Sequence, residues 1–97
     1  MAKKRAATKA ERDHMGRVAE LGCIATIDGI RCNGQAEIHH IGNQGMRATH
    51  WQTIPLCPTH HRNGGFGEAV HQGRRTWEAR YGTEKELLAK VNRMLDV

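Results

Sequence analysis

Within this 97-residue chain, all three cysteines and six of the seven histidines fall between residues 23 and 71. Four of the histidines form adjacent pairs, His39 with His40 in the segment EIHHIG and His60 with His61 in the segment PLCPTHH. Thiolate and imidazole are the side chains that hold zinc and other transition metals in proteins. The grouping therefore predicts two metal sites, one structural and one catalytic.

A chain of this length forms one small domain, and a small domain buries little apolar surface without a covalent or metal staple. Only four residues are Trp, Tyr or Phe, which indicates a small core. Three cysteines would leave one unpaired in any set of disulfides, and no apolar leader segment indicates an oxidising compartment. We therefore expect metal to be the staple.

No apolar run approaches the roughly 20 residues needed to cross a bilayer, so we expect a soluble protein without a membrane partner. Its expected location is the cytoplasm, and the bacterial host cytoplasm if the protein is encoded by a phage. Fifteen Lys and Arg against ten Asp and Glu give a formal charge of +5, which favours an anionic partner such as nucleic acid. Residues 1–12 are expected to be a basic flexible tail along a phosphate backbone, followed by a single domain over residues 13–97.

Local patterns predict an α+β fold. Thr8 with Glu11, and Thr83 with Glu86, have the spacing of a capping box that begins a helix. We expect helices over about 8–21, 58–63 and 74–81 and from residue 83 onward, strands over 36–41 and 53–56, and a hairpin or zinc-knuckle-like loop over 23–33 with a turn at Asp28-Gly29. The apolar residues of the last helix are expected to be core: Leu87, Leu88, Val91, Met94 and Leu95.

The cysteines predict a structural zinc site. Cys57 precedes His60 by three residues, a separation that lets two side chains on one tight turn reach the same tetrahedral ion. Cys23 and Cys32 stand at the two ends of the predicted loop and would complete a Cys3His set. The alternative is that the cysteines are ordinary small buried residues, as lone cysteines often are.

The remaining histidines suit a catalytic ion, which needs open positions for water and substrate. His39, His61 and His71 are its candidate ligands. His40, next to the first of them, is placed to take a proton from an attacking water at neutral pH. Each of these histidines taken singly is open to a simpler interpretation as a hydrogen-bonded surface or core residue.

The segment EIHHIG, followed roughly twenty residues later by PLC and HH, resembles the HNH or ββα-metal endonuclease family. More narrowly, the sequence from PLCPTHH through HQGRRTWEARYG resembles phage Ref-like, RecA-dependent nucleases and small prophage HNH proteins. The segment RCNGQAEIHHI is similar to the zinc-holding segment of the latter. The resemblance implies a small zinc-stabilised ββα-metal core with flanking helices, in which a hairpin and a helix hold one divalent ion against a scissile phosphate.

The resemblance also implies a role for each candidate. It makes His40 the general base. It makes His39, His61 and His71 the ligands of the catalytic ion, and Cys23, Cys32, Cys57 and His60 the ligands of the structural zinc.

The chain departs from the family pattern at three places. Gln52 stands where the middle Asn of the HNH name is usual, and His50 stands where Asp is frequent. We expect both to brace the loop between the strands. Thr26 stands where a second cysteine would complete a CxxC pair, and Gly65 stands where the last metal histidine is common, so His71 must follow a glycine-rich insertion.

The function implied is hydrolysis of DNA phosphodiester bonds, in phage or prophage recombination or DNA processing. The expected cofactors are a structural Zn²⁺ and one catalytic divalent ion, Mg²⁺, Mn²⁺, Ni²⁺ or Zn²⁺, although an all-histidine ligand set is unusual for Mg²⁺. The expected partners are single- or double-stranded DNA and a RecA-type recombinase filament. The candidate phosphate contacts are Arg47, Arg62, Arg74, Arg75 and Arg80.

A noncatalytic, zinc-stabilised DNA-binding or adaptor protein is the alternative function. In such a protein the histidine cluster would be structural or degenerate. His40 discriminates between the two functions, because a pure binding module has no need of a second histidine beside His39.

Overall fold

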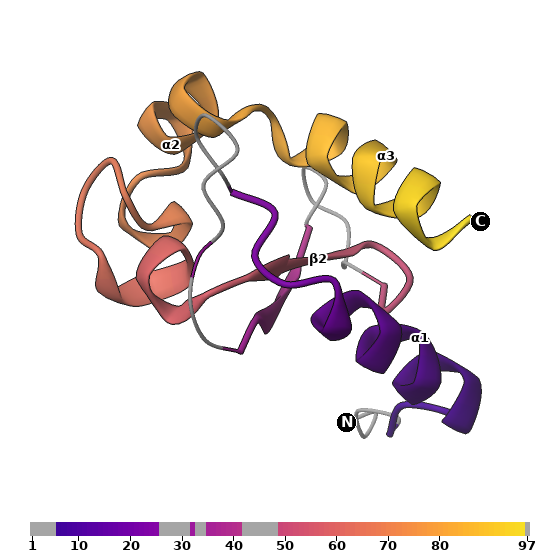
Figure 1. Cartoon of the computed structure of the whole chain (residues 1–97). Helices are drawn as coiled ribbons and strands as arrows, with labels where there is room; N and C mark the ends of the chain where they lie inside the picture. Colours follow the sequence, from indigo (N-terminus) through magenta and orange to yellow (C-terminus); the bar gives the residue numbers. More distant parts are fainter. Residues whose placement is uncertain (1–5, 26–31, 33–34, 42–48, 97) are drawn as a thin grey trace, which may run out of the picture.

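The structure, a computed structural model, describes residues 6–25, 32, 35–41 and 49–96. In chain order its elements are the helix α1 (Lys9–Glu20), the strands β1 (Glu37–His40) and β2 (Thr53–Leu56), the short helical turns η1 (Thr59–Asn63) and η2 (Val70–Gln72), and the helices α2 (Arg74–Tyr81) and α3 (Glu84–Leu95). Figure 1 shows this order from indigo to yellow. The α+β class is confirmed, and the expected turn at Asp28-Gly29 lies outside the described residues.

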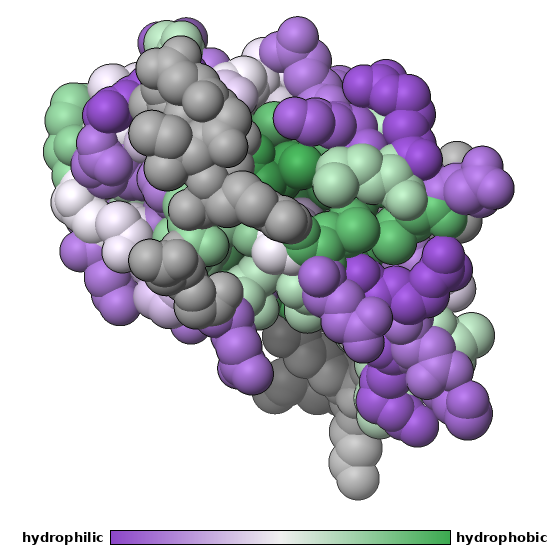
Figure 2. Space-filling model, viewed as in Figure 1, coloured by the Kyte–Doolittle hydropathy of each residue, from purple (hydrophilic) through white to green (hydrophobic). Residues whose placement is uncertain are grey.

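The two strands pair antiparallel, with His39 opposite Ile54 and His40 opposite Thr53. β2 is buried along its whole length, and both α1 and α3 pack against it. Figure 2 shows the result as a strip of hydrophobic side chains between α1 and α3, bordered by the hydrophilic outer faces of the two helices. β2, α1 and α3 thus supply much of the small core, to which Val70 of η2 and Trp77 of α2 also belong.

The two predicted capping boxes are both present. Thr8 Oγ1 accepts from the backbone N–H of Glu11 at 3.1 Å, and the Glu11 carboxylate accepts from the backbone N–H of Thr8 at 2.7 Å. Thr83 and Glu86 repeat this arrangement at 3.1 and 3.0 Å at the start of α3. Each N-cap stabilises its helix by about 1 kcal/mol. Gly82, with φ at 109°, ends α2 in a conformation that other residues rarely adopt.

Two sequence expectations are corrected, and one element of the structure was not expected. Residues 9–12 of the expected flexible tail form the first turn of α1, where Lys9 Nζ lies 2.8 Å from the Asp13 carboxylate. Met94 was expected in the core but is 49% exposed, because it lies at the edge of the buried stripe in the last turn of α3. The turn η2, which carries His71, was not expected.

The helix expected over residues 58–63 is present as a turn of π-helix that begins after Pro58. Trp77 is fully buried, and its ring centroid lies 5.3 Å from that of Tyr81, four residues later on α2. Within the portion of the chain that is described, no helix has the length and apolar character needed to cross a membrane.

Candidate active site and metal centres

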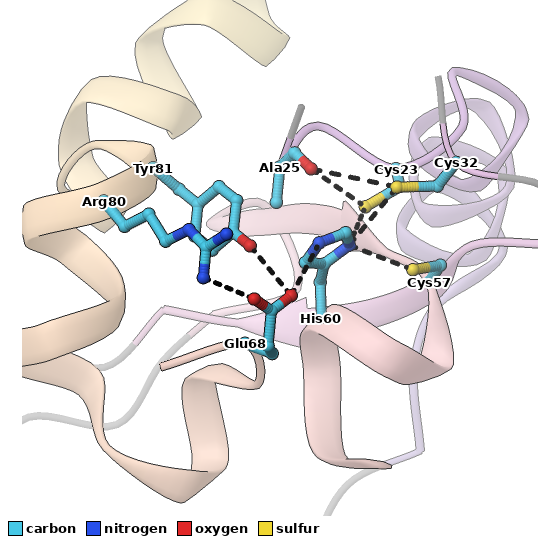
Figure 3. Close-up of polar contacts among 8 residues, drawn as sticks. All are labelled: Cys23, Ala25, Cys32, Cys57, His60, Glu68, Arg80 and Tyr81. Carbon is cyan, nitrogen blue, oxygen red and sulfur yellow. Dashed lines mark hydrogen bonds and ion pairs between the residues drawn. The ribbon is translucent and has the colours of Figure 1, made fainter. Parts of the chain in front are cut away.

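Three cysteines and one histidine come together at one end of the hairpin. One potential ligand atom from each of Cys23, Cys32, Cys57 and His60 lies within 4.8 Å of the others. The three sulfurs lie 3.5, 3.2 and 3.2 Å from Nδ1 of His60 (Figure 3). A tetrahedral zinc with Zn–S about 2.3 Å and Zn–N about 2.0 Å separates such atoms by about 3.5 Å. The spacing therefore fits a Cys3His zinc site, although the role of these residues as ligands stays a prediction.

Local folding places these ligand atoms. Ile24 donates its backbone N–H to the Pro55 carbonyl at 2.9 Å, which holds Cys23 beside the end of β2. Cys57 follows β2 directly, and its carbonyl accepts from the backbone N–H of His61 at 2.9 Å. This bond closes the turn that brings His60 back over the strand end.

A carboxylate lies behind the histidine of this cluster. Glu68 Oε2 lies 3.9 Å from Nε2 of His60, and the Tyr81 hydroxyl donates to the same oxygen at 3.2 Å. Arg80 pairs with the other carboxylate oxygen of Glu68, as Figure 3 shows. Carboxylates in this position fix the orientation and tautomer of a metal-binding histidine. Arg80, expected to contact phosphate, is thus engaged in this arrangement.

Burial sets the protonation of the cluster. It raises the pKa of the Cys23 thiol to about 12, and it lowers the pKa of His60 while Glu68 acts in the opposite direction. The Cys23 thiol therefore keeps its proton at neutral pH unless a cation displaces it. Metal bound here would be held less tightly as the pH falls.

Three further histidines come together from β1, η1 and η2. One potential ligand atom from each of His39, His61 and His71 lies within 4.8 Å of the others, and the Nε2 atoms of His61 and His71 are 3.0 Å apart. Burial lowers the pKa of both His61 and His71, so both rings are neutral near pH 7 and have a lone pair to offer a metal. These are the residues that the resemblance assigns to the catalytic ion, and that role stays a prediction.

A pocket of about 410 Å³ opens beside this second cluster. Its lining residues come from β1, η2 and the starts of α2 and α3: His39, His40, Val70, His71, Gly73, Arg74 and Glu84. The pocket therefore joins two of the three candidate ligands to the candidate general base and to a cation. This combination can hold an anionic phosphate next to a group that accepts a proton.

Two carboxylates, which sequence analysis missed, orient the histidines. Nδ1 of His61 donates to Glu37 at 2.9 Å, and Nε2 of His39 donates to Glu84 at 2.5 Å. Glu37 shares a strand face with His39, since side chains two apart point the same way, and this pattern was available in the sequence. Glu84 gave no such signal, because an acid in the first turn of a helix is common.

Gln52 and His50, which were expected to brace the loop between the strands, make different contacts. The main chain of Gln52 links the loop, since its carbonyl accepts from the backbone N–H of Ile41 at 2.9 Å and its own N–H donates to Thr49 at 3.1 Å. His50 instead contacts the candidate base, with its Nδ1 2.9 Å from Nε2 of His40. The pKa of His40 is lowered, chiefly by burial and then by the neighbouring His50 and His39.

The remaining arginines differ in their surroundings. Arg62 and Arg75 are exposed, and Arg74 lines the pocket with Nη1 3.7 Å from Glu84 and Nε 3.9 Å from Glu78. Arg47 lies outside the described residues. Among the arginines that the structure describes, Arg74 is therefore the one that lines this pocket.

We expect Glu84→Gln to weaken metal binding at the histidine cluster by about 10-fold or more, since loss of a partner behind a ligand typically costs that much. The amide keeps the size of the side chain but cannot attract the imidazole N–H as a carboxylate does. Titration calorimetry with Mn²⁺ on zinc-loaded protein measures the effect. Glu20→Gln, an equal change of charge on the exposed face of α1, is the matched control, and equal affinity in the two variants would contradict the prediction.

Comparison with known proteins adds one finding. Residues 7–96 match the model of the family described as recombination enhancement, RecA-dependent nuclease. The match spans nearly the whole chain and includes both clusters. No curated protein matches the chain.

Proposed function

The chain belongs to the family of recombination enhancement, RecA-dependent nucleases, and from this premise we propose that it is a metal-dependent HNH endonuclease that hydrolyses DNA phosphodiester bonds. Family membership gives the protein a nuclease role in recombination. The type of nuclease, its metal dependence, its residues and a phage or prophage origin belong to the proposal.

One observation carries most of the weight: His40 borders the same pocket as His39, His71 and Arg74. Neighbouring strand residues point to opposite faces, and accordingly His39 is buried and His40 exposed. A ligand position and a solvent-facing base thus come from consecutive residues. A protein that only binds DNA has no need of this pairing.

In the proposed mechanism, His39, His61 and His71 would hold the divalent ion. A bound ion of this kind stabilises negative charge on the phosphate and on the leaving oxygen. Glu37 and Glu84 hold two of these rings through their N–H groups.

His40 takes the proton from the attacking water. Its Nε2 is occupied by the contact with His50, which leaves Nδ1 as the proton acceptor. Because its lowered pKa keeps the ring neutral near pH 7, the base is in its active form under physiological conditions. Arg74 would contact phosphate oxygens, for which a guanidinium is well matched.

The proposal includes DNA as substrate and a RecA-type filament as partner. The expected result is nicking or cleavage of plasmid or single-stranded DNA in Mg²⁺, Mn²⁺, Ni²⁺ or Zn²⁺, with the largest rate when the DNA carries a recombinase filament. A chelator that strips the histidine site should abolish cleavage, and added metal should restore it. Elemental analysis of the stripped protein verifies that the zinc of the cysteine site remains.

Cleavage that persists after the metal is removed would contradict the metal dependence. Absence of cleavage under every metal and filament condition, with DNA binding intact, would favour the zinc-stabilised binding protein instead.

A further inference from the structure

Phe66 is an apolar side chain that the core does not use. Its exposed fraction is 73%, the highest among the large hydrophobic residues of the described part of the chain. A partner that covers this ring would remove its apolar surface from solvent, which is favourable.

The turn that presents Phe66 is held by its own backbone. Gly64 donates to the Thr59 carbonyl at 2.9 Å, and the N–H groups of Glu68 and Ala69 both donate to the Gly65 carbonyl, at 3.1 and 2.9 Å. Phe66 is therefore displayed at a defined position.

The Phe66 ring also packs against Gly73, a residue that lines the pocket. A Cβ atom on Gly73 would lie 2.7 and 2.8 Å from two carbons of the Phe66 ring. Any residue other than glycine at position 73 would therefore displace the ring. Gly73 itself lines the pocket together with His40 and His71. The aromatic ring thus contacts a residue that lines the pocket in which the scissile phosphate is proposed to lie.

Cations accompany the ring. Arg74, which follows Gly73 directly, lines the pocket and keeps 57% of its side chain exposed, and Arg75 and Arg62 are exposed as well. Proteins that bind single-stranded nucleic acid combine positive charge along the backbone with aromatic rings on which bases stack. Paired bases in a duplex stack on each other and offer no free face without unstacking.

We propose that Phe66 is a nucleobase-binding residue: its ring stacks on an unpaired base next to the phosphate held in the pocket. The proposal rests on the proposed function for the position of the phosphate, whereas the stacking itself requires no catalysis. It makes unpaired DNA the preferred ligand of this face.

The test uses His40→Ala protein, in which strands are bound without being cut, and compares Phe66→Ala, Phe66→Leu and Phe66→Trp. Stacking on one base corresponds to about 5- to 150-fold in affinity. We expect the Ala and Leu variants each to bind a short oligo(dT) about 10-fold more weakly than the parent. The Trp variant, which keeps an aromatic ring at this position, should bind it like the parent. Duplex binding should change by less than about 2-fold, since the intact helix offers the ring no free base.

A spectroscopic signal checks the geometry. Emission of the Phe66→Trp variant should be quenched by oligo(dT) beyond the quenching of its parent. Met94→Ala, which removes an exposed apolar side chain from α3, is the control and should bind like its parent.

Parent-like binding by Phe66→Leu, or equal losses on duplex and single strand, would overturn the proposal. The two proposals fail separately. If the otherwise unaltered protein never cleaves DNA but Phe66→Ala and Phe66→Leu lose oligo(dT) binding and Phe66→Trp keeps it, the stacking site stands without the nuclease mechanism. If it cleaves single strands and Phe66→Ala binds and cleaves them equally well, the stacking proposal alone is wrong.

Discussion

Replacement of His40 by alanine is expected to lower DNA cleavage by about 100-fold or more while the fold, the metal content and DNA binding are retained. A positioned general base contributes on this order to the rate, and the exposed His40 side chain contributes nothing to the core. Single-turnover cleavage with saturating protein measures the loss. The same assay on His39→Ala should show lost activity together with lost metal at the histidine cluster, because that residue is a proposed ligand.

Lys90→Ala, which truncates an exposed side chain on α3, is the control for both variants and should cleave like the parent. A His40→Ala protein that cleaves within a few-fold of the parent would remove His40 from the mechanism.

The pH profile gives an independent readout of the same group. The pKa of His40 is lowered by burial and by the nearby His50 and His39. Because the neutral ring is the active form, the rate should rise with pH through a value below the ordinary histidine pKa of about 6.5 and then level off. The His40→Ala variant should lack this rise, and a parent profile that rises only at or above the ordinary histidine pKa of about 6.5 would contradict the assignment.

Replacement of Cys57 by serine is expected to remove the structural zinc and to unfold the domain. Apparent binding energies of structural zinc are about 10–16 kcal/mol, whereas the net stability of a domain of this size is about 5–15 kcal/mol. The metal contribution is therefore comparable to the whole stability. Elemental analysis and circular dichroism together measure the effect, with about one tightly held zinc per chain expected in the parent.

Ala89→Ser places the same residue on the exposed face of α3 and should keep both the zinc and the fold. A Cys57→Ser protein that is free of zinc yet melts like the parent would show that the cysteine cluster is not a staple.

The sequence by itself was sufficient for the features that depend on near neighbours. The Thr8 and Thr83 capping boxes, the strand at residues 53–56 and the helix over residues 74–81 were all predicted, because a cap, a short strand or a short helix is decided within a few residues. The members of the two metal-ligand groups were also named from the sequence, because the cysteines and all but one of the histidines gather between residues 23 and 71. The structure brings each group together, and the roles of its members remain to be measured.

Only the tertiary structure decided which groups support these residues. Glu84 reaches His39 across 45 positions of sequence, and the distance between them depends on how α3 packs against β2. The contact between the Phe66 ring and Gly73 likewise brings the glycine-rich turn against the start of α2.

Met94 is a residue for which the sequence pattern predicted a core contact that the structure does not contain. It has the helical spacing of a core residue but lies at the edge of the packed face. A sequence pattern records which side of a helix is apolar, because that follows from its period. How far the packed face extends, and which distant side chain it brings to a histidine, depends on contacts between elements that have no fixed spacing in the sequence.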